Sequence, residues 1–111
     1  MSDWPYFSEV HEDMNPDFMD KLVSLRQDLG FPLPVTSSLR NDNRHSAHNL
    51  GRAVDINIWG EKAFKLISDA PKFGFVGIGV KQHGPHEKRF IHLDDVIDVN
   101  DFPRPTVWSY K

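Results

Sequence analysis

The sequence predicts an α+β domain in which a small, mostly antiparallel sheet packs against two helices. Three observations lead to this class. Two segments place apolar residues every three or four positions, as amphipathic helices do. Short β-branched segments, bounded by glycine, proline and asparagine, are typical of strands. The chain has 111 residues, which is the length of one domain, so we expect residues 1–111 to share one modest core.

The first helix is expected at residues 16–29. Asn15 is a favourable N-cap, and Pro16 suits the first helical position. Gly30 is a natural helix stop because it tolerates the left-handed conformation. The apolar stripe of this helix consists of Phe18, Leu22, Leu25 and Leu29.

The second helix is expected at residues 61–70, with Pro71 ending it. Its apolar face consists of Ala63, Phe64, Ile67 and Ala70. The expected strands are 34–38, 52–59, 75–80 and 89–93, with 107–110 as an edge strand or a packed tail. The segment 40–49 is polar, and we expect a surface loop there.

Composition excludes several classes of protein. Apolar residues make up 39% and charged residues 26%, as in ordinary globular domains. A net charge of −3 without a basic block gives no indication of nucleic-acid binding. No apolar run is long enough for a membrane span. The N-terminus lacks the features of a signal peptide, so we expect synthesis in the cytoplasm. Cysteine is absent, so a zinc site would need histidine and carboxylate ligands. We expect a monomer.

Asp55 is an unusual residue for its position. It stands between Val54 and Ile56 in an expected strand, where aspartate is disfavoured. A buried carboxylate without a partner costs several kcal/mol. Asp55 therefore needs a cation, which could be Arg40, Arg52 or a metal ion.

Two histidines could join Asp55. His48 precedes it by seven residues, and Gly51 between them lets the chain turn back. His92 lies in an expected core strand and would face Asp55 if the two strands were neighbours. Each histidine alone is more often a solvated or satisfied core residue. Together the three side chains suit Zn²⁺ and leave a fourth position for water, whose pKa the metal lowers to about 7.

A hydrolytic site also needs a general base. Asp94 leaves the strand on the same face as His92, whereas Asp95 points the other way. Glu87, in the preceding loop, is the second candidate. A solvated strand-end acid is the alternative for Asp94. Arg40 could bind a substrate carboxylate through two hydrogen bonds.

Ser46-Ala-His48-Asn-Leu-Gly51-Arg-Ala-Val-Asp55 closely resembles the S-x-H-x-x-G-x-A-x-D signature of the zinc D-alanyl-D-alanine carboxypeptidase group. That group includes L-alanyl-D-glutamate endolysin peptidases, and the hedgehog signalling domain shares its fold and metal site. Four more segments resemble family motifs in the same order. They are 35–40, 74–80, 90–94 and 103–110, the last similar to the "PRPxxWSY" tail of short phage-type members.

The resemblance implies a hedgehog-like or DD-peptidase-like fold, with zinc held by His48, Asp55 and His92. It implies that Arg40 and Ser46 orient the substrate. The implied activity is hydrolysis of a peptide bond in the stem peptides or cross-links of bacterial peptidoglycan. Action at the bacterial cell wall would follow release from the cell or incorporation into a virion.

One departure from the family pattern concerns the base. Many members carry a catalytic Glu or Asp three residues before the last zinc ligand, where this chain has Arg89. Asp94 is then expected to be the general base, with Glu87 as the second candidate. The alternative is a catalytically silent, zinc-containing binding or assembly module of a phage or prophage. A zinc ion that only stabilises a small core is a third interpretation.

Overall fold

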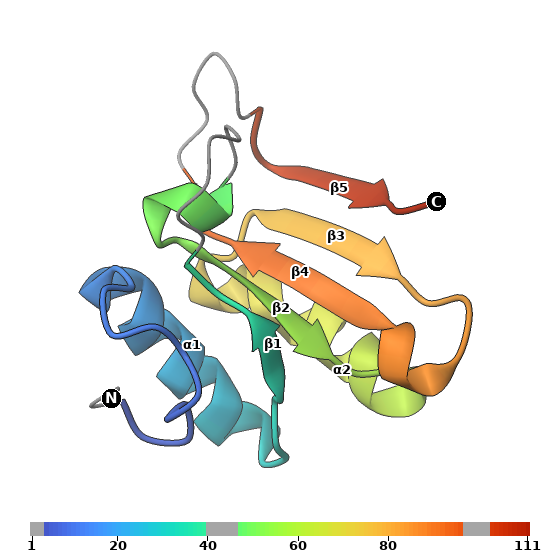
Figure 1. Ribbon diagram of the computed structural model, residues 1–111, viewed down its shortest axis with the longest axis horizontal. Coiled ribbons are helices and arrows are strands. Elements are labelled where there is room, and N and C mark those ends of the chain that lie inside the picture. Colours follow the sequence, from blue (N-terminus) through green and yellow to red (C-terminus); the bar gives the residue numbers. More distant parts are fainter. Residues whose placement is uncertain (1–3, 40–46, 97–102) are drawn as a thin grey trace.

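The computed structural model describes residues 4–39, 47–96 and 103–111 (Figure 1). The helices are α1 (Pro16–Leu29) and α2 (Gly60–Asp69). The strands are β1 (Val35–Ser37), β2 (Ala53–Asn57), β3 (Gly77–Lys81), β4 (Phe90–Asp94) and β5 (Thr106–Ser109). Short 3-10 helices are η1 (Ala47–Leu50), η2 (Ala70–Phe73) and η3 (His86–Lys88). In this part of the chain, neither α-helix is long and apolar enough to cross a bilayer. The predicted α+β class is confirmed.

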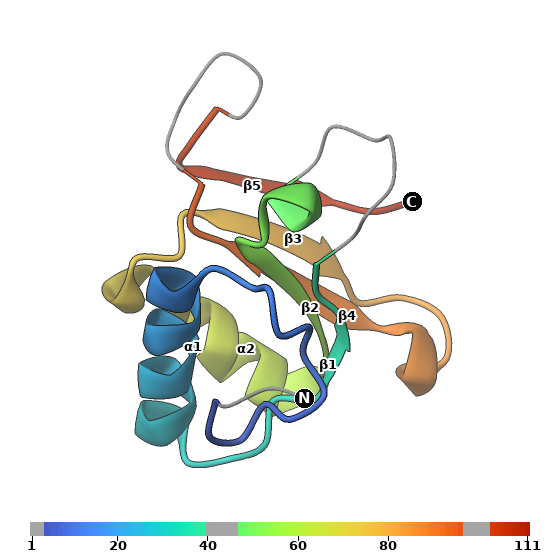
Figure 2. The same ribbon diagram turned by 60° about the vertical axis from the view of Figure 1, so that its left-hand side comes forward.

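The five strands form one mixed sheet in the order β1-β2-β4-β3-β5. Every neighbouring pair is antiparallel except β3 and β5, which are parallel. The segment expected as an edge strand or a tail is therefore an edge strand. Figure 2 shows α1 and α2 together on one side of the sheet and η1 on the other. The helices thus leave the second face of the sheet open for a site.

The ends of α1 follow the sequence signals. The Asn15 side chain accepts a hydrogen bond from the Phe18 N–H at 3.0 Å, which caps the first turn. Gly30 adopts the left-handed conformation (φ 78°), and its N–H donates to the Arg26 carbonyl. The second helix begins one residue earlier than expected, at Gly60. It also ends one residue earlier, because Ala70 opens η2, in which Pro71 is the second residue.

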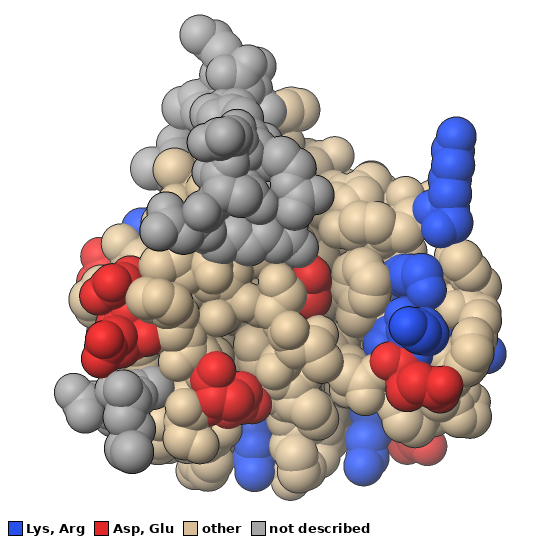
Figure 3. Space-filling model, viewed as in Figure 1, with Lys and Arg blue, Asp and Glu red and all other residues tan. Residues whose placement is uncertain are grey.

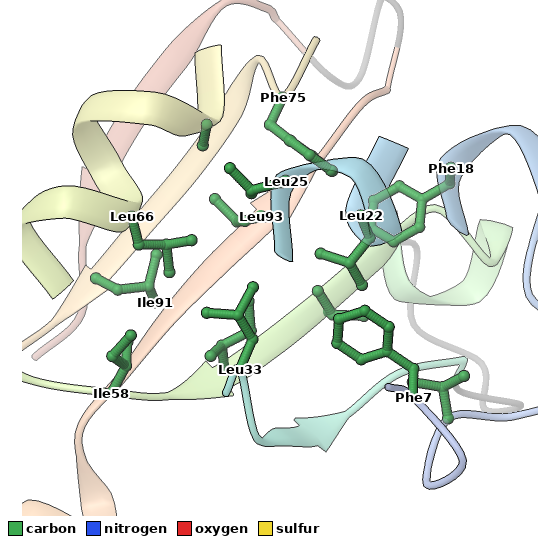
Figure 4. Close-up of a cluster of buried hydrophobic side chains, with 14 of the residues drawn as sticks. Phe7, Phe18, Leu22, Leu25, Leu33, Ile58, Leu66, Phe75, Ile91 and Leu93 are labelled. Atoms are coloured by element: carbon green, nitrogen blue, oxygen red, sulfur yellow. The ribbon is translucent and has the colours of Figure 1, made fainter. Parts of the chain in front are cut away.

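The core lies between the two helices and one face of the sheet (Figure 4). On β2 and the residue after it, Val54, Ile56 and Ile58 are buried in this core, as the alternating pattern predicted. Phe18 of α1 meets Phe75 edge to face, with ring centroids 5.4 Å apart. Because the apolar residues of β2 face the helices, the alternate residues of the same strand face the open side.

One row of residues crosses the whole open face. The strand registers place its members directly opposite one another on all five strands. The row consists of Ser37, Asp55, His92, Gly79 and Trp108. Two of the residues that the sequence singled out therefore lie side by side at the centre of the sheet.

We predict that Phe18→Ala lowers the free energy of unfolding by about 3–5 kcal/mol, because it leaves a cavity in the core. Phe64→Ala is the matched control. The sequence placed Phe64 on the apolar face of the second helix, but this was wrong: Phe64 is 72% exposed, and Leu66 is buried in its place. Urea unfolding of the two variants measures the difference. Equal losses for both variants would contradict the assignment of the core.

Candidate metal centre

Three side chains from three elements meet on the open face: His48 from η1, Asp55 from β2 and His92 from β4. Their candidate ligand atoms all lie within 4.8 Å of one another. His48 Nε2 and His92 Nδ1 each lie 3.3 Å from Asp55 Oδ1. The three residues are 3%, 7% and 4% exposed, in chain order. The cluster that the sequence suggested therefore exists, and it is buried.

The turn at Gly51 brings His48 over β2. Gly51 has φ 69°, which favours glycine. Its N–H donates to the His48 carbonyl, and its own carbonyl accepts from the Asn15 N–H at 2.9 Å. A Cβ at this position would lie 3.3 Å from the Asn15 nitrogen. The segment 40–49 was expected to be a surface loop. Its described part, from Ala47 onward, belongs instead to the short helix η1, in which Ala47 and His48 are buried.

Asp55 and His92 face each other because β2 and β4 are neighbours in register. The sequence analysis made their meeting conditional on this pairing, and the sheet satisfies the condition. The His48 and His92 rings lie 5.1 Å apart at 72°. The carboxylate therefore lies between two imidazoles that approach it from different directions.

In each histidine, one ring nitrogen faces an oxygen atom outside the cluster, and this contact shows which nitrogen is left to bind a metal. His48 Nδ1 is 2.8 Å from the Ser38 carbonyl oxygen. A carbonyl only accepts, so Nδ1 carries the proton and Nε2 keeps its lone pair. His92 Nε2 is 2.7 Å from Asp94 Oδ2 and donates to it. His92 Nδ1 is buried and has no hydrogen-bond partner within the described residues. Metal-binding histidines show this arrangement, with the second nitrogen donating to an oxygen.

The charges in the cluster are mutually dependent. Burial alone would raise the pKa of Asp55, but the two histidines outweigh burial and lower that pKa to about 2. Burial alone would lower the pKa of His92, but the carboxylates of Asp55 and Asp94 outweigh it and raise that pKa. A metal needs the unprotonated ring, so a metal at His92 would compete with a proton for the ring nitrogen.

Arg52, one of the alternative cations for Asp55, is engaged elsewhere. Its Nε donates to Asp95 Oδ1 and its Nη2 donates to Asp95 Oδ2, each at 2.8 Å. Lys21 of α1 also donates to Asp95, at 2.9 Å. Asp95 thus turns toward α1, as the strand alternation predicted. Arg40 and Ser46 lie outside the described residues, and their proposed contacts with substrate stay predictions.

The two candidate bases occupy different surroundings. Asp94 is fully buried beside His92, so it is no solvated strand-end acid. Burial alone would raise its pKa, but hydrogen bonds from His92 and Arg104 outweigh burial and lower the pKa. Glu87 is exposed on η3, at the Phe90 end of β4 (Figure 1). The position three residues before His92 holds Arg89, whose Nε donates to the Gly84 carbonyl.

The sequence analysis missed three residues around the cluster. Arg104 binds Asp94, and the Trp108 ring lies 4.9 Å from the His92 ring. Gly77 leaves room for the Asp94 carboxylate, which a Cβ at that position would overlap. The tail motif of residues 103–110 was visible in the sequence, but only the pairing of β5 with β3 places it here.

A buried His-Asp-His cluster that could hold a metal ion, set on the open face of a small α+β sheet, defines a candidate metalloenzyme. A family model described as Peptidase M15 matches residues 7–94. The chain therefore belongs to the peptidase M15 family, whose members are metal-dependent. No curated protein and no solved structure gives a match.

We predict that Asp55→Asn and His48→Ala each abolish stoichiometric binding of a divalent metal, because each removes a ligand from a three-ligand set. His83→Ala is the control, since His83 is exposed and its ring contacts the Tyr110 carbonyl. Elemental analysis of dialysed protein gives the metal content. Chelation should also lower the melting temperature of the wild type and of His83→Ala. Retention of metal by Asp55→Asn and His48→Ala would refute the cluster as the binding site.

Proposed function

We propose that this chain is a zinc-dependent peptidase that hydrolyses a peptide bond in the stem peptides or cross-links of bacterial peptidoglycan. One observation carries the proposal. His48 Nε2 and His92 Nδ1 converge on Asp55 Oδ1 while their other ring nitrogens face oxygen acceptors. Two imidazoles and one carboxylate are a ligand set that suits catalytic zinc, and the chain is an M15 peptidase by family.

Bound zinc would supply Lewis-acid polarisation of a peptide carbonyl and activation of water. The protein's own side chains fix the geometry around that chemistry. The Ser38 carbonyl accepts from His48 Nδ1, and the Asp94 carboxylate accepts from His92 Nε2, so both rings are held in place. The Trp108 ring packs beside His92 and restricts its movement on the β5 side.

We propose Asp94 as the first candidate for the general base because it is adjacent to His92. Its carboxylate lies on the Nε2 side of that ring and binds Arg104 through both oxygens, so it would have to leave Arg104 to reach a water on the metal. Its lowered pKa makes it a weak proton acceptor at neutral pH, since a base works best with a pKa near the working pH. Glu87 is therefore a second candidate for the general base. It is exposed on η3 and free of the burial that constrains Asp94.

The substrate class follows from the resemblance of the motifs, including the phage-type tail at 103–110. Stem peptides carry free carboxylates, which Arg40 and Ser46 are proposed to orient. Figure 3 shows Lys and Arg side chains over the β3–η3–β4 connection, with acidic side chains directly beside them. We propose that the protein acts as a monomer at the bacterial cell wall, as a lysin or a virion component.

The second candidate function is a silent binding or assembly module that keeps its metal. One observation favours it. Arg89 stands where many family members have a catalytic acid, and its guanidinium is tied to the Gly84 carbonyl of its own loop. Under this interpretation the protein binds wall peptides in a metal-dependent way without cleaving them.

We predict that the zinc-loaded protein cleaves purified muropeptides and that chelation stops the reaction. Mass spectrometry of the products identifies the bond, because removal of D-alanine, cleavage after L-alanine and opening of a cross-link give different masses. Asp55→Asn is the inactive control, since it removes a ligand. Binding of muropeptides without any product would refute the peptidase and support the silent module.

We predict that Asp94→Asn, assayed at saturating zinc, lowers kcat by about 10²–10⁴-fold if Asp94 is the base. Glu87→Gln should then keep near wild-type turnover. The reverse pattern would transfer the role to Glu87. Full turnover by both variants would eliminate both acids as the base.

A further inference from the structure

Arg104 connects the C-terminal segment to the metal centre. Its Nε donates to Asp94 Oδ1 at 2.8 Å, and its Nη2 donates to Asp94 Oδ2 at 2.7 Å. Asp94 Oδ2 also accepts from His92 Nε2 at 2.7 Å. Arg104, Asp94 and His92 therefore form an unbroken chain of charge-assisted hydrogen bonds that ends at a predicted zinc ligand.

The surrounding residues are shaped for this chain. Gly77 has no side chain where the Asp94 carboxylate lies. Gly79 has none where the Trp108 ring lies, since a Cβ there would be 2.7 Å from the indole. The Arg104 guanidinium in turn lies 5.3 Å from the centre of the Trp108 ring. Two alternate glycines of β3 thus make room for the contacts around His92.

The physical role of Arg104 follows from the burial of its partner, Asp94. Asp94 has no exposure to solvent, so its charge needs a buried cation. If Arg104 were lost, the two hydrogen bonds that fix the Asp94 carboxylate would be lost with it, and His92 Nε2 would no longer have a fixed acceptor. The ring could then rotate or exchange tautomers, and Nδ1 would no longer be directed at Asp55.

We propose that Arg104 is a positioning residue of the metal centre: through Asp94 it holds the His92 ring so that Nδ1 faces the zinc position. The inference rests on the proposed function, because it requires that the cluster binds zinc. Arg104 lies beyond residues 7–94, the region that matches the family. The segment that leads into β5 is then part of the site and does more than complete the sheet.

The experiment measures the Zn²⁺ affinity of the full chain by competition with a chromophoric chelator. Arg104→Met should weaken Zn²⁺ binding by about 10–100-fold, the usual effect of losing a hydrogen-bonded residue behind a metal ligand. Arg104→Lys should lie between this variant and the wild type, because lysine keeps the charge but loses the two-bond geometry.

Arg52→Met is a matched control. It removes an arginine–carboxylate pair of equal geometry from the next residue of the chain, Asp95, which turns toward α1. This variant should lose stability and keep the wild-type Zn²⁺ affinity. Equal losses of affinity in Arg52→Met and Arg104→Met would indicate general destabilisation and overturn the proposal.

A second variant and a second readout keep the test sharp if Arg104→Met folds poorly. Gly77→Ala displaces the Asp94 carboxylate without changing Arg104, and it should weaken Zn²⁺ binding as well. Long-range ¹H–¹⁵N NMR of the zinc-loaded wild type should show His92 bound through Nδ1 and protonated at Nε2. The Gly77→Ala and Arg104→Lys variants should show a mixture of ring states.

The outcomes separate the two proposals. Stoichiometric zinc in the wild type with unchanged affinity in Arg104→Met, Arg104→Lys and Gly77→Ala would overturn the role of Arg104 alone. A wild type that binds no stoichiometric zinc would overturn the metal centre, and the role of Arg104 with it.

Discussion

The carboxylate of Asp55, held between two imidazoles on a buried sheet face, is the constraint on which the rest of the structure depends. A lone carboxylate at this depth would cost several kcal/mol, and each histidine would be equally costly if charged without a partner. The three groups stabilise one another, and a divalent cation between them would satisfy all three at once. Gly51, the η1 turn and the β2–β4 register all bring these side chains to one point. The helices on the other face supply the apolar burial that holds the sheet in place.

Local signals predicted the elements well because each reflects short-range physics. The Asn15 cap, the apolar stripe and Gly30 fixed both ends of α1 without reference to the rest of the chain. The alternation along β2 assigned Asp55 and Ile56 to opposite faces, and both assignments agree with their contacts. The boundary errors were one residue at each end of α2, where the first helical residue is a glycine and the chain passes directly into η2. At the strands they reached two residues: β2 ends at Asn57 where 59 was expected, and β3 begins at Gly77 where 75 was expected.

The parts that the sequence did not reveal depend on pairing between distant segments. Periodicity assigns a face to each residue but does not say which strand lies beside which. Arg104 meets Asp94 only because β5, which follows β4 in the sequence, joins the sheet beyond β3 and parallel to it. Gly77 and Gly79 lie in a segment for which the sequence predicted only a strand, and the room that they leave is apparent only from the Asp94 and Trp108 side chains that occupy it. The cluster itself was predictable because a buried aspartate is anomalous in its own local context.

Asp94 and Asp95 show how one strand end serves two purposes. The two acids are consecutive, both are buried, and each is bound by an arginine through two short hydrogen bonds. Strand alternation sends them to opposite faces. Asp95 joins Arg52 and Lys21 and so fastens β4 to α1, a contact that serves the fold. Asp94 joins Arg104 and His92, so a pair with the same two-bond geometry lies beside the candidate metal centre. The same chemistry therefore acquires a structural or a functional role only through the face on which it lies.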